Sequence, residues 1–389
     1  MPRQPLFAKG ATGLARIRPS AHAGFTLIEL MIGLAIGLLA TLAITQTLLV
    51  SEGQKRTATA GSNAQVGGVL ALSTLRQSIQ MAGYGFSSSP DSIGCQVQAR
   101  FNGADPWAAA TPVAPQMVPV VITNGASGAP DSIRVLSSSK NSFSVPIRII
   151  APGYNPALAG FETAFPIASV RSVAQGDLMV AVTDSTTTCQ VFQASADPGA
   201  LSQVDRADDS AKWNLAGYPD RAYNDGQFLI NMGAFNDVVY SVGVRNTLQS
   251  NTFVLAADST PSYSGPVNLF SNIVNLQAYY GKDTDANGSV DTWDNVTPTT
   301  NAGWLQVLAI RVAVVSQSNQ FEKTDSNNKN VTETNPLWDV GADSLITEAV
   351  ACGTSKCVPL KVDHLTDWKQ YRYKVFDTIV PLRNMIWRS

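Results

Sequence analysis

The chain begins with a short basic segment and then a long apolar run. Residues 1–24 carry four basic residues and no acid, and the apolar run extends from Phe25 to Val50. Its 26 residues would span about 39 Å as a helix, enough to cross a hydrocarbon core of roughly 30 Å. Basic residues before a span keep that end in the cytoplasm. We therefore predict a transmembrane helix over 25–50 and export of the rest of the chain.

A different helical pattern follows over residues 51–85. Apolar residues recur there at helical spacing between polar ones, at Val66, Val69, Leu72, Leu75 and Ile79. This pattern predicts an amphipathic continuation of the same helix, with that face packed on a globular domain. Gly61, Gly67 and Gly68 each cost about 1 kcal/mol relative to Ala inside a helix, so we expect a kink or a melted turn there. The helix should end near Gly83.

From residue 86 onward the pattern changes to short apolar runs separated by Gly, Asn, Asp and Pro. Strand composition is found at 118–123, 132–137, 143–150, 177–183, 189–193, 237–244, 252–257, 272–281, 305–318 and 370–380. The predicted fold class is α+β: a long N-terminal helix packed on a β-rich globular domain of antiparallel sheets, residues 86–389, and not a βαβ array. The polar run 320–336 is expected to be an exposed loop.

Composition adds the compartment and excludes one class of partner. Only 14% of the 389 residues are charged and 21 are proline, which is typical of a β-rich extracytoplasmic protein. The formal net charge is −2, and removing the four basic residues of the leader leaves −6. A mildly acidic body has no basic stripe for phosphates, so nucleic acid is excluded as a general partner.

The four cysteines suit two disulfides in an oxidising compartment, and four reduced thiols are the alternative. Cys352 and Cys357 enclose a short GTSK loop, and proximity favours closure of that pair. Cys95 would then pair with Cys189, tying the segment after the helix to a predicted strand. Four cysteines allow three pairings, so the sequence alone leaves the connectivity open.

One acid, Glu29, lies near the start of the apolar run. A carboxylate in lipid costs several kcal/mol unless it is paired. An ordinary secretory signal would have a shorter apolar core followed by a cleavage site of small residues. Cleavage after Gly24 would instead leave the helix on the mature protein, with the α-amino group of Phe25 as a cation. Glu29 could then pair with such a cation on its own chain or on a neighbour. The alternative is a plain signal anchor.

The stretch GFTLIELMIGLAIG resembles the prepilin signature of type IV pilins and type II secretion pseudopilins. The resemblance implies that a prepilin peptidase cuts after Gly24 and that Phe25 becomes the N-methylated terminus. It also implies that Glu29 neutralises the N-terminal amine of an adjacent subunit during assembly. Two departures are the lack of the mid-helix proline found in many major pilins and a longer leader.

The globular part is similar to the PilW family of minor pilins, which is related to J-type pseudopilins of type II secretion. The similarity is carried by GDLMVAVTD, TTTCQVFQ, NIVNLQAYYGKDTDANGSVDTW, WLQVLAIRVAVVSQS and YRYKVFDTIVPLRN. It implies a low-abundance pilin that helps initiate the pilus and sits near its tip. The implied partners are other minor pilins, the major pilin, the prepilin peptidase and a large tip adhesin. The implied location is the inner membrane, with a periplasmic domain, and then the cell-surface pilus.

One polar loop has the spacing of a calcium site. Oxygen ligands recur at alternate positions, followed by an acid at the twelfth position: Asp283, Asp285, Asn287, Ser289 (through its carbonyl), Asp291 and Asp294. Calcium takes six to eight oxygen ligands, and this spacing wraps them around one point. We therefore predict a structural Ca²⁺ site of modest affinity, with a solvated turn as the alternative.

Catalysis has little support in the sequence, which contains no HExxH, GxSxG or Walker motif. His364 is the single histidine outside the leader and is expected in a structural loop. Four tryptophans are expected to pack in the core or at interfaces, although a sugar-binding surface is the alternative: Trp293, Trp304, Trp368 and Trp387. Two functions remain, a structural pilus subunit, which we favour, and a tip-exposed binding module; an enzyme is not expected.

Overall fold

The structure is a computed structural model that describes residues 24–107, 116–141, 144–183, 188–199, 201–208, 212–323, 329–346 and 348–386. The leader up to residue 23 and part of the predicted loop 320–336 lie outside the described residues. The chain divides into two compact units, Met1–Thr57 and Ala58–Ser389.

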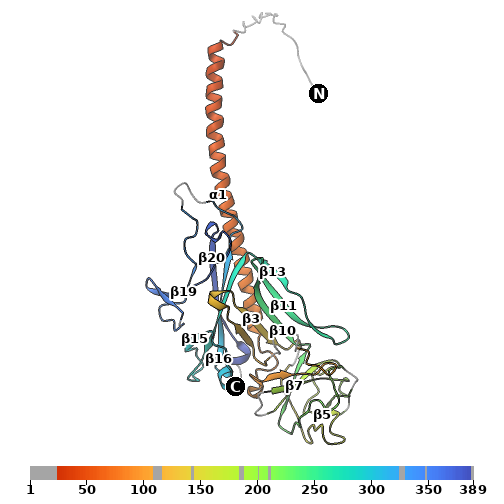
Figure 1. Ribbon diagram of the computed structural model, residues 1–389. Coiled ribbons are helices and arrows are strands. Elements are labelled where there is room, and N and C mark those ends of the chain that lie inside the picture. The colour runs from red at the N-terminus through yellow and green to blue at the C-terminus, as the bar shows by residue number, and fades with distance from the viewer. Residues whose placement is uncertain are drawn as a thin grey trace, which may run out of the picture. The chain divides into compact units, whose positions relative to one another are not determined.

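Helix α1 runs from Leu27 to Met81 and contributes to both units (Figure 1). The most apolar 18-residue stretch within its segment Leu27–Lys55 has a mean hydropathy of 2.4, and the structure buries none of that stretch. By length and composition this segment is able to cross a membrane, in agreement with the predicted span. Among the described residues it is the one helix that meets this test.

The second unit is built on four antiparallel strands in the order β15-β14-β16-β20. Their bounds are Ile273–Lys282 for β14, Thr292–Asp294 for β15, Val307–Gln317 for β16 and Tyr373–Pro381 for β20. One face of this sheet, with Ile310 and Val312, shares a core with Leu75 and Ile79 of α1. The other face, with Val315, packs on a different cluster that includes Trp338. The sheet is therefore buried on both sides.

Two larger sheets and two small ones complete the second unit. A six-stranded sheet has the path β12-β11-β10-β3-β2 with β13 also on β11, and a five-stranded sheet has the order β1-β7-β6-β9-β4. All their pairings are antiparallel except β1 with β7.

The bounds in the six-stranded sheet are β2 Val120–Thr123, β3 Ser132–Ser137, β10 Asn236–Gly243, β11 Thr247–Leu255, β12 Pro261–Tyr263 and β13 Val267–Ser271. In the five-stranded sheet they are β1 Gln96–Gln98, β4 Ile147–Arg148, β6 Leu178–Val182, β7 Thr188–Gln193 and β9 Phe228–Gly233. The small sheets contain β17 Leu337–Asp339, β18 Val350–Cys352 and β19 Ser355–Pro359, and β5 Ala164–Pro166 with β8 Gln203–Asp205. Two short helices are α2 Asn301–Leu305 and α3 Arg383–Ile386. All ten predicted runs contain a strand, whereas ten strands were not predicted: β1, β5, β8, β9, β12, β13, β15, β17, β18 and β19.

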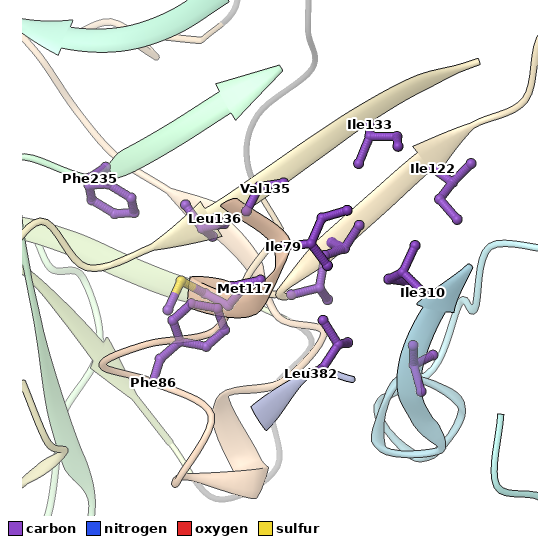
Figure 2. Packing of buried hydrophobic residues seen from close by; sticks show 14 of the residues in the cluster. Ile79, Phe86, Met117, Ile122, Ile133, Val135, Leu136, Phe235, Ile310 and Leu382 are labelled. Carbon is purple, nitrogen blue, oxygen red and sulfur yellow. The ribbon is translucent and has the colours of Figure 1, made fainter. Parts of the chain in front are cut away.

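The main core gathers side chains from segments far apart in the sequence. Figure 2 shows Ile79 of α1 among residues of β2 and β3, with Ile310 of β16 and Leu382 at the end of the chain nearby. Phe86 and Met117 close the same cluster below the helix end. A third cluster gathers buried residues between Ile147 and Leu229 and is separate both from this core and from the cluster that includes Trp338. The β-rich body therefore has one core on the helix and two clusters away from it.

The predicted melted turn in α1 is absent, because the helix continues through Gly61, Gly67 and Gly68. A Cβ atom built on Gly68 would overlap Cε2 of the Phe376 ring. The ring of this β20 residue therefore occupies the space that any other side chain would need. Packing against β20 offsets the poor helix propensity of glycine at this point.

The predicted buried face of α1 is correct at its end and wrong at its start. Leu75 and Ile79 are fully buried, but Val66 and Val69 are 55% and 50% exposed. The buried stripe begins instead with small residues, Ala64, Gly68 and Ala71. Small residues let the helix approach the sheet closely, and that contact selects their stripe over the neighbouring apolar one.

The helix ends as predicted, just before Gly83. Gly83 and Gly85 adopt φ values of 77° and 96°, which favour glycine. The Gly83 N–H donates to the Leu136 carbonyl at 2.8 Å, and Asn384 Nδ2 donates to the Ala82 carbonyl at 2.9 Å. The last described segment of the chain therefore caps α1.

Asp131 is a buried carboxylate that joins two sheets and is only 1% exposed. Its oxygens accept from the Gly125 N–H at 2.8 Å and from the Ala278 N–H of β14 at 2.9 Å. Burial raises the pKa of Asp131 to about 6, against an ordinary value of 3.8, because the N–H donors of Gly125 and Ala278 offset only part of the cost of desolvating the carboxylate.

We predict that Gly68→Ala destabilises the protein, whereas Gly61→Ala does not. Both changes improve helix propensity by about 1 kcal/mol. At Gly61 nothing lies within 4 Å of the added Cβ, but at Gly68 the Phe376 ring must move, which costs about 1–3 kcal/mol. Denaturation of the detergent-solubilised chain measures both, and Phe376→Leu should relieve the Gly68→Ala defect. Equal stabilisation by the two substitutions would contradict this packing.

We predict a pH dependence of stability from Asp131. Between about pH 4 and pH 6 the native state keeps a proton that the unfolded chain has released, so the free energy of unfolding falls as the pH rises. A shift from 3.8 to about 6 corresponds to about 3 kcal/mol. Melting curves across this range should show the loss in the natural protein and a flatter profile in Asp131→Asn. Identical profiles would refute the assignment.

Candidate functional site

The first unit begins with a hydrogen-bonded cap on α1. The Glu29 N–H donates to Thr26 Oγ1 at 3.3 Å, and Glu29 Oε2 accepts from the Thr26 N–H at 3.0 Å and from Thr26 Oγ1 at 2.8 Å. This reciprocal pattern is a capping box, which satisfies N–H groups that a helix start leaves free. Thr26 and Glu29 thus act together to start the helix.

Thr26 was not among the predicted site residues. A Thr followed three residues later by a Glu, just before an apolar run, is the sequence signal that would have found it. Gly24 and Phe25 precede the helix in non-helical, exposed backbone, and Phe25 is 89% exposed. The bond between Gly24 and Phe25 is therefore accessible, one turn before the Glu29 carboxylate.

In the second unit, three of the predicted metal ligands lie together in the loop between β14 and β15. One carboxylate oxygen from each of Asp283, Asp285 and Asp291 lies within 4.8 Å of the others. Asp283 is mostly buried, and its two oxygens accept from the Asn287 N–H at 3.1 Å and the Gly288 N–H at 2.8 Å. This acidic cluster could bind a metal ion.

The remaining predicted ligands are used differently. Asn287 Oδ1 accepts from the Ser289 N–H at 2.7 Å, and Asn287 Nδ2 donates to Asp285 Oδ2 at 2.9 Å. Asp294 lies in β15 and forms an ion pair with Lys282 Nζ at 2.6 Å. Asp294 does not join the cluster, because strand pairing places it opposite Tyr280 and beside Lys282.

Hydrogen bonds hold the acidic loop in a defined shape. Asp291 Oδ2 accepts from the Thr284 N–H at 2.7 Å and from the Thr284 hydroxyl at 3.0 Å. These donors hold the pKa of Asp291 below its usual value, so its carboxylate stays ionised at neutral pH. Three negative charges are thus brought together by the backbone of their own loop, an arrangement in which a cation would relieve their mutual repulsion.

Both predicted disulfides are present. Cys95 is bonded to Cys189 and Cys352 to Cys357, with Cα–Cα distances of 5.7 and 5.8 Å. The first fastens the segment after α1 to β7, where β1 and β7 also pair. The second closes the hairpin formed by β18 and β19.

The tryptophans are dispersed and not gathered into one surface. Trp304 is buried in the main core, and Trp293 and Trp368 are partly buried against the cluster that contains Trp338. Trp387 lies outside the described residues. His364 is exposed in a turn. The packing role expected for the tryptophans therefore holds for the three that the structure describes.

Comparison with known proteins gives two family-level matches. Residues 238–384 match the family model described as Type IV Pilus-assembly protein W, and residues 19–45 match the Prokaryotic N-terminal methylation motif. No curated protein matches the chain in sequence. Among solved structures it is similar to a type IV-like pilin from Thermus thermophilus, at 9% identity over 85% of this chain and 97% of that chain, with a TM-score of 0.29. Because that score is low, the two family matches are the informative ones.

Proposed function

We propose that this chain, which belongs to the PilW family of type IV pilus proteins, is a minor pilin that helps initiate the filament and lies near its tip. The observation that carries the proposal is the start of α1. There the matched methylation motif coincides with an accessible Gly24–Phe25 bond and with Glu29 at the head of a membrane-length helix. Its role is structural and not catalytic.

In this proposal the prepilin peptidase cuts after Gly24, and Phe25 becomes the N-methylated terminus. The chain is first a single-pass inner-membrane protein with a periplasmic domain, and then a subunit of the surface pilus. Its partners are the major pilin, other minor pilins and a large tip adhesin. The disulfides support a domain that matures outside the cytoplasm.

Glu29 has two candidate roles within this proposal. In the chain as it stands, its carboxylate caps α1 through Thr26. After cleavage, the α-amino group of Phe25 becomes a nearby cation, either on the same chain or on an adjacent subunit. A buried carboxylate among packed helices is costly without such a partner. We propose that charge pairing, beyond capping, is what assembly requires of Glu29.

A tip-exposed binding role is a second candidate, and a specific observation favours it. The core between Ile147 and Leu229 lies outside the residues that match the PilW model. The segments around this core are therefore additional to the matched region 238–384. A J-type pseudopilin of type II secretion is the related alternative, but the match is to a pilus-assembly family.

We further propose that the loop with Asp283, Asp285 and Asp291 binds Ca²⁺ and that the ion is structural. Calcium prefers carboxylate and carbonyl oxygens, and three carboxylates already converge there. The loop connects β14 to β15 at the edge of the main sheet, so an ion would fix how these strands meet.

Substitutions at Glu29 separate the two roles. Glu29→Val removes both the cap and the charge, whereas Glu29→Gln keeps a side-chain oxygen for the capping box but has no charge. We expect both variants to be cut at Gly24 yet to be nearly absent from sheared pili. Mass analysis of the N-terminus and immunoblots of pili measure this. Normal incorporation of Glu29→Gln would show that capping is sufficient.

Two reference strains anchor that experiment. Deleting the gene should remove most surface pili, and Gly24→Glu should leave an uncut precursor in the membrane. Normal piliation with lost attachment in the deletion strain would favour the binding role instead. A mature N-terminus other than Phe25 would contradict the cleavage assignment.

The calcium proposal predicts a shift in melting temperature. An ion that binds the folded form alone stabilises it by about 2.7 kcal/mol at a hundredfold excess over Kd. Melting curves of the detergent-solubilised chain with calcium and with chelator should differ. The Asp283→Ala, Asp285→Ala double variant should lose that difference, whereas Asp294→Asn, outside the cluster, should keep it. If the melting temperature of the natural chain is the same with calcium and with chelator, the loop is a solvated turn and not a calcium site.

A further inference from the structure

Strand β20 runs along the second half of α1 in the same direction. Lys374, near its start, lines the same groove as Ser62 of α1. The Phe376 ring fills the space beside Gly68, and Asn384, just after the strand, donates to the Ala82 carbonyl. Residue numbers therefore rise together along the two elements, and the direction of β20 is fixed relative to the helix (Figure 1).

The hydrogen-bonding pattern shows which groups of β20 face away from β16. The two strands pair without a register shift from Ala309↔Pro381 to Gln317↔Tyr373. Leu382 N–H donates to the Leu308 carbonyl, and Ser318 N–H donates to the Arg372 carbonyl. Hydrogen-bonded pairs alternate in an antiparallel ladder, so the even-numbered residues of β20 bond to β16. The odd-numbered residues therefore direct their N–H and C=O groups outward.

The outward groups form a free sheet edge. β20 ends the strand order, and within the part of the chain that the structure describes, no hydrogen bond reaches the backbone of Val375, Asp377 or Ile379. The segment just before these three residues does have a backbone partner, because the N–H groups of Val331 and Thr332 donate to the Lys369 carbonyl. Pro381, whose missing N–H would also point outward, marks the other end of the edge.

An edge of this kind has a specific chemical complement. Its donors and acceptors alternate along one extended strand, and another extended backbone satisfies all of them at once. Ile379 is 50% exposed beside this edge, and Asp377 carries a charge that is paired at 3.4 Å with Arg311. Proteins usually shield such edges, and among the residues that the structure describes the backbone of three outward-facing residues, Val375, Asp377 and Ile379, has no partner.

We propose that the free edge of β20 receives an extended strand from a neighbouring pilin subunit, which joins the two sheets across the subunit boundary. The proposal rests on the filament role argued above. Subunits added along a filament meet through heterologous contacts, in which two different surfaces face each other. The occupant is therefore another strand of a neighbour and not a second β20.

The geometry also argues against pairing of two β20 strands. Antiparallel pairing would reverse one copy, and with it the second half of α1, because β20 and α1 run in the same direction. Such a pair of identical edges is related by a two-fold axis, which closes the contact to a dimer. Parallel pairing would require a two-fold axis, which closes the contact to a dimer and ends growth.

Asp377 allows a matched test. Asp377→Pro removes an outward N–H that β16 does not use, and proline is tolerated at such edge positions. Asp377→Ala removes the same carboxylate, and so the Arg311 contact, but keeps the N–H. Both variants should be equally abundant and equally cut at Gly24 in membranes. We expect about tenfold less Asp377→Pro than Asp377→Ala in sheared pili, from the lost hydrogen bond and the ring's clash with the incoming strand.

A photoreactive benzoyl-phenylalanine in place of Ile379 identifies the occupant. An adduct with a different pilin supports the proposal, whereas an adduct of two copies through β20, or none, overturns it. If the natural chain is present in the pili and the two Asp377 variants are incorporated equally, the strand-addition proposal is also overturned. If the natural chain is itself absent from sheared pili, the filament role fails, and this inference fails with it.

Discussion

The close contact between α1 and β20 is the constraint on which the second unit depends. Gly68 leaves room for the Phe376 ring, and the small residues Ala64 and Ala71 continue that approach. Leu75 and Ile79 can then reach the core that includes Ile310 and Val380. A larger side chain at Gly68 would move α1 away from β20. Because several segments pack on this helix, the packing of more than one side chain would be lost.

The same contact couples distant parts of the sequence to the helix. Asn384 caps the end of α1, and Leu382 packs in the same core as the buried face of this helix. The last described segment of the chain is therefore in direct contact with the second half of α1. The β16–β20 pairing then fixes the sheet, and β14 carries the acidic loop at its far end. The positions of the loop and of the free edge are both consequences of how the sheet lies on the helix.

Local sequence patterns predicted the helix, ten strand-bearing runs, the favoured disulfide pairs and an acidic loop in which three of the six predicted ligands converge. These predictions failed where two local patterns are equally plausible and only the tertiary packing decides between them. Val66 and Val69 have the spacing of a buried face, yet the sheet selects the stripe of small residues beside them. Asp294 occupies the twelfth loop position, yet pairing of β15 with β14 directs it to Lys282. Such choices depend on contacts between remote residues, which no local spacing encodes.

The core between Ile147 and Leu229 stands apart from the α1 contact. Tyr154, Phe165 and Phe192 stack within it, with ring centroids 4.1 and 4.4 Å apart, and none of its residues belongs to the helix core. Because this stack stabilises its own segment, changes in the surrounding loops need not disturb the packing of α1 on the main sheet. The proposed filament subunit can therefore carry a changed surface on this core while helix α1 and the main sheet stay unchanged, and this separation makes the proposed binding role compatible with the proposed structural one.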